Sequence, residues 1–248
     1  MSALSIFEIK GRIGKFPKKK LIYLPTPFYK LENLSTALEG PEIFIKRDDL
    51  TGLAFGGNKS RKLEFIIQDA LNKKANVIIT WASLQSNWCL QTAAAARESG
   101  IKPVLLLFKT YDLPEEYDGN LLLDYILDAD IRIEEAEKGK LVSAEDAYQI
   151  IKGIVNEYKE KGYNPYIAPI GGSMVGGSME FPLGAISYVN CFAEMLEQAK
   201  AQDIEIDYVV HASGSGGTQG GLVVGAKALK KKVKVLGISV SDQKESFG

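Results

Sequence analysis

A lysine stands at the predicted start of a helix in the segment GGNKSRKLEF. The turn residues Gly56, Gly57 and Asn58 come first, and Lys59 follows directly. The positive end of a helix dipole disfavours an ammonium there, and Lys62 lies one turn further along the same face. Most lysines are simply solvated. A lysine whose ammonium is destabilised can instead attack an aldehyde, and the two amines together could hold an anion.

A second polar cluster enters an alanine-rich helix in the segment TWASLQSNWCLQTAAAARESG, residues 80–100. Ser86 or Asn87 can act as the N-cap of that helix. Free backbone N–H groups beside a hydroxyl and an amide also form a binding site for a carboxylate. Both interpretations remain open on the sequence alone.

A glycine-rich loop joins a predicted strand to a helix predicted over 220–230, in the segment VVHASGSGGTQGGL. Its backbone N–H groups can form a nest that attracts phosphate, contributed by Ser215, Gly216, Gly217 and Thr218. A tight turn of no further meaning is the alternative, although so many glycines cost unfolded-chain entropy. The loop is no P-loop, and Gln219 replaces the last glycine of a dinucleotide fingerprint. We expect His211, in the preceding strand, to be an ordinary core histidine.

Short β-branched runs alternate with helical stripes along the chain, which is typical of βα units on a mostly parallel sheet. The predicted strands cover residues 43–46, 76–82, 103–109, 130–136, 164–170, 206–212 and 233–240. No linker separates two halves, so a second domain must be interwoven with the first.

Composition favours a folded protein that binds small molecules. The 248 residues are 46% hydrophobic and 25% charged, as in ordinary globular proteins. A net charge of −1 argues against nucleic acid or an anionic membrane as partner. A cytoplasmic location is predicted from three features. The chain has only two cysteines, its N-terminus lacks a signal-peptide core, and it contains no long apolar run. A single histidine disfavours most metal and triad chemistry.

Six ordered segments carry a family resemblance. They are LPTPFYKLENLS (24–35), IFIKRDDLTG (43–52), GGNKSRKLE, QSN, GNLLLDYILDADIRI (119–133) and GSGGTQ. The chain resembles, nearly end to end, D-cysteine desulfhydrase and 1-aminocyclopropane-1-carboxylate deaminase, which are pyridoxal-phosphate enzymes of the tryptophan-synthase-β-like fold. The resemblance implies a homodimer with two interwoven three-layer αβα domains and mostly parallel sheets. Residues 1–55 and 164–248 would form the larger, cofactor-binding domain, and 56–163 the smaller inserted domain.

The resemblance also implies roles for the polar residues. Lys59 would form the Schiff base with pyridoxal 5'-phosphate, and Asn58 and Asn87 would flank the cofactor. Ser86 would act on the substrate carboxylate, with Asn87 and Trp88 beside it. The cofactor phosphate would be held by Lys62 together with Ser215, Gly216, Gly217 and Thr218. The expected reaction is β-elimination from D-cysteine to pyruvate, ammonia and sulfide, with ring opening of the cyclopropane acid to 2-oxobutyrate and ammonia as the alternative.

Three departures from the family pattern matter. Trp88 and Leu90 stand where the family commonly has His or Gln and then Arg, which changes the expected substrate pocket. The loop 171–184 is longer than usual, and its glycines predict a mobile edge of the active site. The chain ends before the family's last βα units, so we expect a fragment that lacks the C-terminal part.

Two other functions fit parts of the sequence. One is a nicotinamide-dinucleotide-binding domain, with GSGGTQGG as the phosphate turn and Asp242 as the ribose acid. It leaves GGNKSRKLE without a role. The other is a non-catalytic, truncated remnant that binds a phosphate-bearing ligand.

Overall fold

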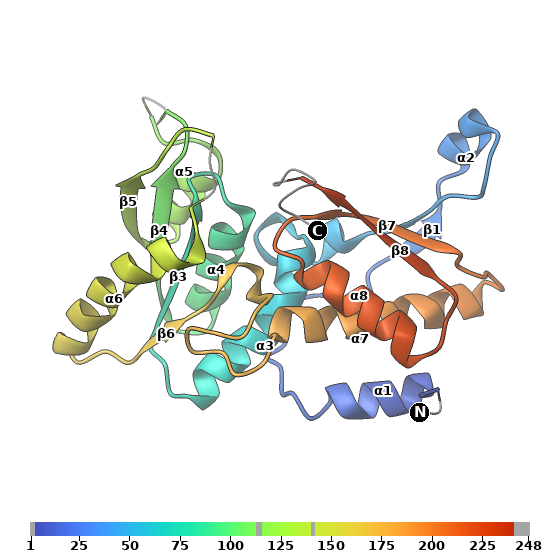
Figure 1. Ribbon diagram of the computed structural model, residues 1–248, viewed down its shortest axis with the longest axis horizontal. Coiled ribbons are helices and arrows are strands. Elements are labelled where there is room, and N and C mark those ends of the chain that lie inside the picture. The colour runs from blue at the N-terminus through green and yellow to red at the C-terminus, as the bar shows by residue number, and fades with distance from the viewer. Residues whose placement is uncertain (1–2, 113–115, 140–141, 241–248) are drawn as a thin grey trace.

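The computed structural model describes residues 3–112, 116–139 and 142–240 (Figure 1). Every predicted strand forms, and β1 is an additional short one. The helices are α1 (Ile6–Ile13), α2 (Glu32–Leu38), α3 (Asn58–Asn72), α4 (Asn87–Glu98), α5 (Gly119–Ile126), α6 (Ala144–Glu160), α7 (Leu183–Ala201) and α8 (Gly217–Ala228). The strands are β1 (Phe28–Lys30), β2 (Phe44–Lys46), β3 (Val77–Ser83), β4 (Lys102–Lys109), β5 (Asp130–Glu135), β6 (Pro165–Ile167), β7 (Tyr208–Ser213) and β8 (Lys234–Ser239).

A four-stranded parallel sheet, in the order β5-β4-β3-β6, is covered on both faces. Side chains alternate across a strand. Val77, Ile79 and Trp81 of β3 therefore pack with one face of β4 against α6. Ile78 belongs instead to the main core, with residues of α4 and α5. This double burial explains why the strands read as nearly continuous apolar runs.

A second βαβ unit consists of β7, α8 and β8, and its two strands are parallel. Its helix α8 packs closely on α7 because glycines face that helix. A Cβ at Gly221 would lie 2.3 Å from the carbonyl oxygen of Ala185, and one at Gly225 would lie 2.9 Å from the ring of Phe192. The outer positions of β7 and β8 expose apolar side chains, among them Val210 and Ile238.

Helix α3 connects the two parts of the molecule. The four-stranded sheet and the β7–β8 pair lie at opposite ends of the view, with α3 between them (Figure 1), and α3 contacts both α4 and α7. The division into 1–55 with 164–248 and 56–163 stays a prediction, and β6 pairs with β3 across its boundary. None of the described helices is long and apolar enough to cross a membrane.

Candidate active site

Lys59 lies in the first turn of α3, as the sequence predicts, directly after a turn that requires glycine. Gly56 and Gly57 have φ of +79° and +125°, and a Cβ at Gly56 would lie 1.8 Å from the carbonyl oxygen of Asp49. The partly buried Lys59 donates from Nζ to Oδ1 of Asn58 at 3.2 Å. Burial lowers the pKa of Lys59, which favours the neutral, nucleophilic amine.

Lys62 is a buried cation without an anionic partner among the residues that the structure describes. Its side chain is 1% exposed, and its ammonium lies 5.7 Å from the ring centroid of Tyr188. Burial and the nearby charge of Lys59 lower the pKa of Lys62 to about 7. The repulsion between the two amines acts on the more deeply buried Lys62, whereas burial is what lowers the pKa of Lys59. Such a site favours an anion.

The glycine-rich loop lies against the start of α3. Helix α8 begins at Gly217, so the predicted start at Gly220 was wrong by three residues. Gly216 is its N-cap at φ +76° and carries no side-chain cap, which leaves N–H groups of the first turn available to a ligand. Asn58 joins loop and lysine, because its Nδ2 donates to Oγ1 of Thr218 at 3.1 Å while its Oδ1 accepts from Lys59.

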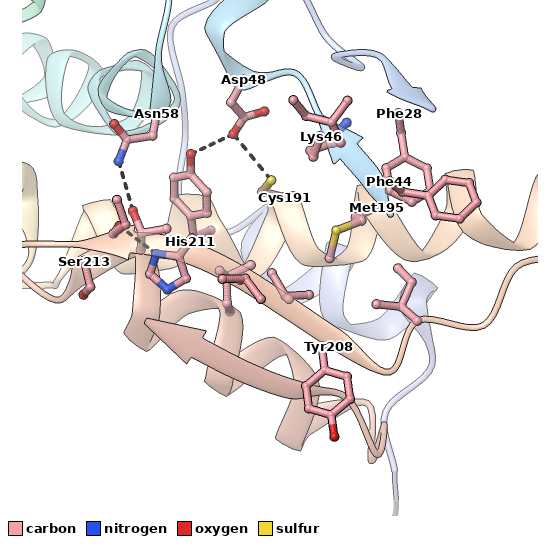
Figure 2. Close-up of a pocket in the computed structure, with 18 of the residues that line it drawn as sticks. Phe28, Phe44, Lys46, Asp48, Asn58, Cys191, Met195, Tyr208, His211 and Ser213 are labelled. Carbon is pink, nitrogen blue, oxygen red and sulfur yellow. Dashed lines mark hydrogen bonds between the residues drawn. The ribbon is translucent and has the colours of Figure 1, made fainter. Parts of the chain in front are cut away.

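These groups line one cavity, which has a volume of about 1270 Å³. Its lining includes Asn58, Lys59, Lys62 and the loop residues Ser215, Gly216, Gly217 and Thr218, together with residues of β2 and β7. Figure 2 shows Asn58 reaching from α3 toward the loop, with Phe28 and Phe44 on the far side. His211 also lines the cavity and is only partly buried, so the expectation of a core histidine was wrong. Its ring nitrogens contact Oε1 of Gln219 at 2.5 Å and the carbonyl oxygen of Ala212 at 2.8 Å.

The residues predicted to bind substrate lie at the start of α4, outside this lining. Ser86 is the N-cap, and its hydroxyl accepts from the backbone N–H groups of Trp88 and Cys89 at 3.1 and 3.3 Å. The exposed Asn87 accepts from Nδ2 of Asn120 at 2.8 Å. The indole of Trp88 is 2% exposed and donates to Oγ1 of Thr80 at 2.6 Å. Trp88 therefore packs in the core, and its role toward substrate stays a prediction.

The loop 171–184 is anchored along much of its length. Ser178 exchanges hydrogen bonds with the backbone of Ile167, at 3.0 Å from its N–H and 2.9 Å to its Oγ. Met179 is buried. Ser173 touches the glycine-rich loop through its hydroxyl, 2.6 Å from that of Ser215, and Gly171 lies against the same serine. Part of this segment therefore packs on β6, and no residue of 171–184 lines the cavity. Its mobility stays a prediction.

An ionic network that the sequence did not predict forms part of the cavity wall, where Asp48 and Tyr188 line the cavity. Arg61, 2% exposed, donates to Oδ1 of Asp48 at 2.8 Å and to Oε1 of Glu194 at 2.9 Å. The hydroxyl of Tyr188 donates to the other oxygen of Asp48 at 2.7 Å. Burial alone would raise the pKa of Glu194, but Arg61 and Lys46 outweigh it and lower that pKa. The network fixes Tyr188 beneath Lys62.

The pyridoxal-phosphate dependent enzyme family matches residues 19–247 of this chain. A partly buried lysine, an unpaired buried cation and an uncapped helix start on one cavity fit an aldehyde that carries a phosphate. The chain belongs to this family, whose cofactor is pyridoxal phosphate. The membership supersedes the nicotinamide-binding interpretation, and Asp242 lies outside the described residues.

Several individual proteins of this family are similar to the chain over most of its length. A Pyrococcus furiosus protein provisionally named a 1-aminocyclopropane-1-carboxylate deaminase is 39% identical over 94% of this chain and 66% of its own length. A Serratia proteamaculans D-cysteine desulfhydrase is 38% identical over 94% of this chain and 67% of its own. The crystal structure of an ACC deaminase homologue matches with TM-score 0.80 and 36% identity, over 94% of this chain and 65% of that one. The chain thus spans about two thirds of these relatives.

Proposed function

We propose that this chain acts as a pyridoxal-phosphate lyase on a small amino acid, as a D-cysteine desulfhydrase that releases pyruvate, ammonia and sulfide. The observation that carries the proposal is Lys62, a buried cation with no anionic partner in the described part of the chain, one turn from the amine of Lys59. The relatives' names support ring opening of 1-aminocyclopropane-1-carboxylate to 2-oxobutyrate and ammonia equally well. We further propose a cytoplasmic homodimer.

The proposed mechanism divides the work among this chain's residues. Bound pyridoxal phosphate supplies an aldehyde for covalent attachment and a ring that withdraws electrons from the substrate Cα. The amine of Lys59 would attach the cofactor and, when free, would take the Cα proton at Nζ. Its lowered pKa favours the neutral form that both tasks need. Asn58 holds that nitrogen in place through its Oδ1.

The cofactor phosphate and the substrate carboxylate would occupy two different helix starts. Lys62 and the N–H groups of Gly216, Gly217 and Thr218 would bind the phosphate at the start of α8. Ser86 accepts two backbone N–H bonds and retains its own hydroxyl proton for a substrate carboxylate at the start of α4. Asn87 would act beside it, flanking the cofactor.

Reductive labelling tests the assignment of Lys59. The protein is incubated with pyridoxal phosphate and reduced with borohydride, and its peptides are then weighed. The amine adds to the aldehyde carbon with loss of water, and borohydride reduces the C=N bond that forms. We expect the label on Lys59 in the natural chain and its loss in Lys59→Ala, while Lys152→Ala, on the outer helix α6, labels normally. A label on other lysines alone would refute the proposal.

Product assays separate the two reactions. Pyruvate and sulfide from D-cysteine support the desulfhydrase, and 2-oxobutyrate from 1-aminocyclopropane-1-carboxylate supports the deaminase. Labelling at Lys59 without either product would indicate a chain that binds the cofactor but has no activity on these substrates, as expected of a non-catalytic remnant.

A further inference from the structure

The glycine turn before Lys59, Gly56 and Gly57, is held in its conformation by residues from other parts of the chain. Its glycines supply no side chain, and Gly57, the residue before α3, makes no side-chain cap. On one side the turn is held by Thr51, whose hydroxyl lies 3.0 Å from the N–H of Gly57, and by the carbonyl oxygen of Asp48, which accepts from the same N–H at 2.9 Å. The opposite side faces α4.

Gln91 of α4 holds that opposite side. Its carboxamide is 4% exposed. Its Nε2 donates to the carbonyl oxygen of Gly56 at 2.8 Å, and its Oε1 accepts from the hydroxyl of Ser60 at 2.7 Å. One side chain therefore binds the main chain three residues before Lys59 and the side chain one residue after it.

The side chain of Gln91 lies so close to the turn that position 57 must be glycine. A Cβ at Gly57 would lie 3.0 Å from Nε2 of Gln91, so a larger residue there would push the carboxamide away. The only hydrogen bond of the Lys59 side chain within the described residues goes to its neighbour Asn58. Asn58 is itself held by Thr218, so the position of Nζ depends on that side chain and on the main chain, which Gln91 and Thr51 hold from opposite sides.

We propose that Gln91 is a positioning residue that fixes the Lys59 amine relative to the start of α4. Helix α4 also begins with Ser86 and Asn87, one turn before Gln91. The lysine turn and the predicted carboxylate site are thus tied to one rigid helix. This inference rests on the proposed function, because it assigns Gln91 a part in the reaction of Lys59 with the cofactor aldehyde.

The rate of cofactor attachment tests the proposal without requiring catalytic turnover. Pyridoxal phosphate is mixed with the protein, the reaction is stopped with borohydride at set times, and the labelled Lys59 peptide is quantified. In Gln91→Leu the amine loses its alignment, and a displacement of about 1 Å can slow a reaction about 100-fold. We expect attachment to slow by at least about tenfold, with an unchanged circular dichroism spectrum.

Gln91→Glu gives a second readout that loss of packing alone would not produce. A carboxylate beside the turn favours the ammonium of Lys59, so the pH at which attachment is half-maximal should rise relative to the natural chain. Ser60→Ala removes one of the two contacts with a small change in volume, and should slow attachment less than Gln91→Leu. It also serves as the variant to measure if Gln91→Leu fails to fold.

The matched control is Gln68→Leu, further along the same helix α3, where the glutamine donates to Oδ1 of Asn72 four residues away. It should label at the natural rate. Equal rates in Gln91→Leu, or in Ser60→Ala if Gln91→Leu does not fold, would overturn the positioning role while leaving the proposed function intact. A natural chain that never labels at Lys59 would refute both.

Discussion

Replacing Lys62 by methionine should stabilise the protein in the absence of bound anion. The side chain is 1% exposed, and its pKa falls from the ordinary 10.5 to about 7. At about 1.4 kcal/mol for each pH unit, the buried ammonium costs at most roughly 5 kcal/mol of folding free energy. Methionine has a similar length and no charge, so Lys62→Met removes that cost.

The sign of the pH dependence follows from proton binding. Between pH 7 and 10.5 the unfolded chain holds a proton at Lys62 that the folded chain lacks, because the folded pKa is the lower one. The free energy of unfolding of the natural protein therefore rises with pH across this window. The penalty is complete below about pH 7 and absent above the ordinary pKa of 10.5. Lys62→Met should lack this rise.

Urea unfolding from pH 6 to 9.5, without cofactor or phosphate, measures the difference. We expect Lys62→Met to be several kcal/mol more stable than the natural chain at pH 6, with most of the gap lost by pH 9.5. Inorganic phosphate should narrow the gap, because the anion stabilises the ammonium only in the natural chain. The control Lys227→Met, at an exposed position, should show no such gap. A pH-independent gap, or a less stable variant at pH 6, would contradict the reasoning.

Three further substitutions test the packing around the site. Arg61→Met should lower the free energy of unfolding in urea by about 3–5 kcal/mol, because the partly buried Asp48 loses the cation that pairs with it and the buried Glu194 keeps only Lys46; a change below about 1 kcal/mol would show that the network contributes no more than an exposed ion pair. Gly221→Ala should cost about 1–3 kcal/mol, because the new methyl group meets a carbonyl of α7, whereas Gly220→Ala on the same helix meets nothing and should stabilise. Ser86→Ala should cost about 1 kcal/mol through the lost N-cap, measured by thermal unfolding, and an unchanged midpoint would show that the cap contributes nothing.

Local patterns predicted the strands and the helix starts at Lys59 and Ser86, because these depend on residues close in sequence. The ionic network was not predictable in this way. Arg61 stands among Lys59 and Lys62 in one basic run, and only tertiary packing decides which of the three meets Asp48. The orientation of Trp88 depends likewise on Thr80 of a neighbouring strand. The prediction placed the start of α8 too late, because glycines favour loops. The first turn of α8 nevertheless begins at Gly217.

The position of the two tryptophans has a practical consequence. Trp81 lies on β3 and Trp88 on α4, both buried, and the chain has no others. Tryptophan fluorescence therefore reports on the four-stranded sheet and α4, and no tryptophan lies on β7, β8 or α8. Emission compared with circular dichroism during denaturation would reveal whether the two ends of the molecule melt together, with no engineered dye.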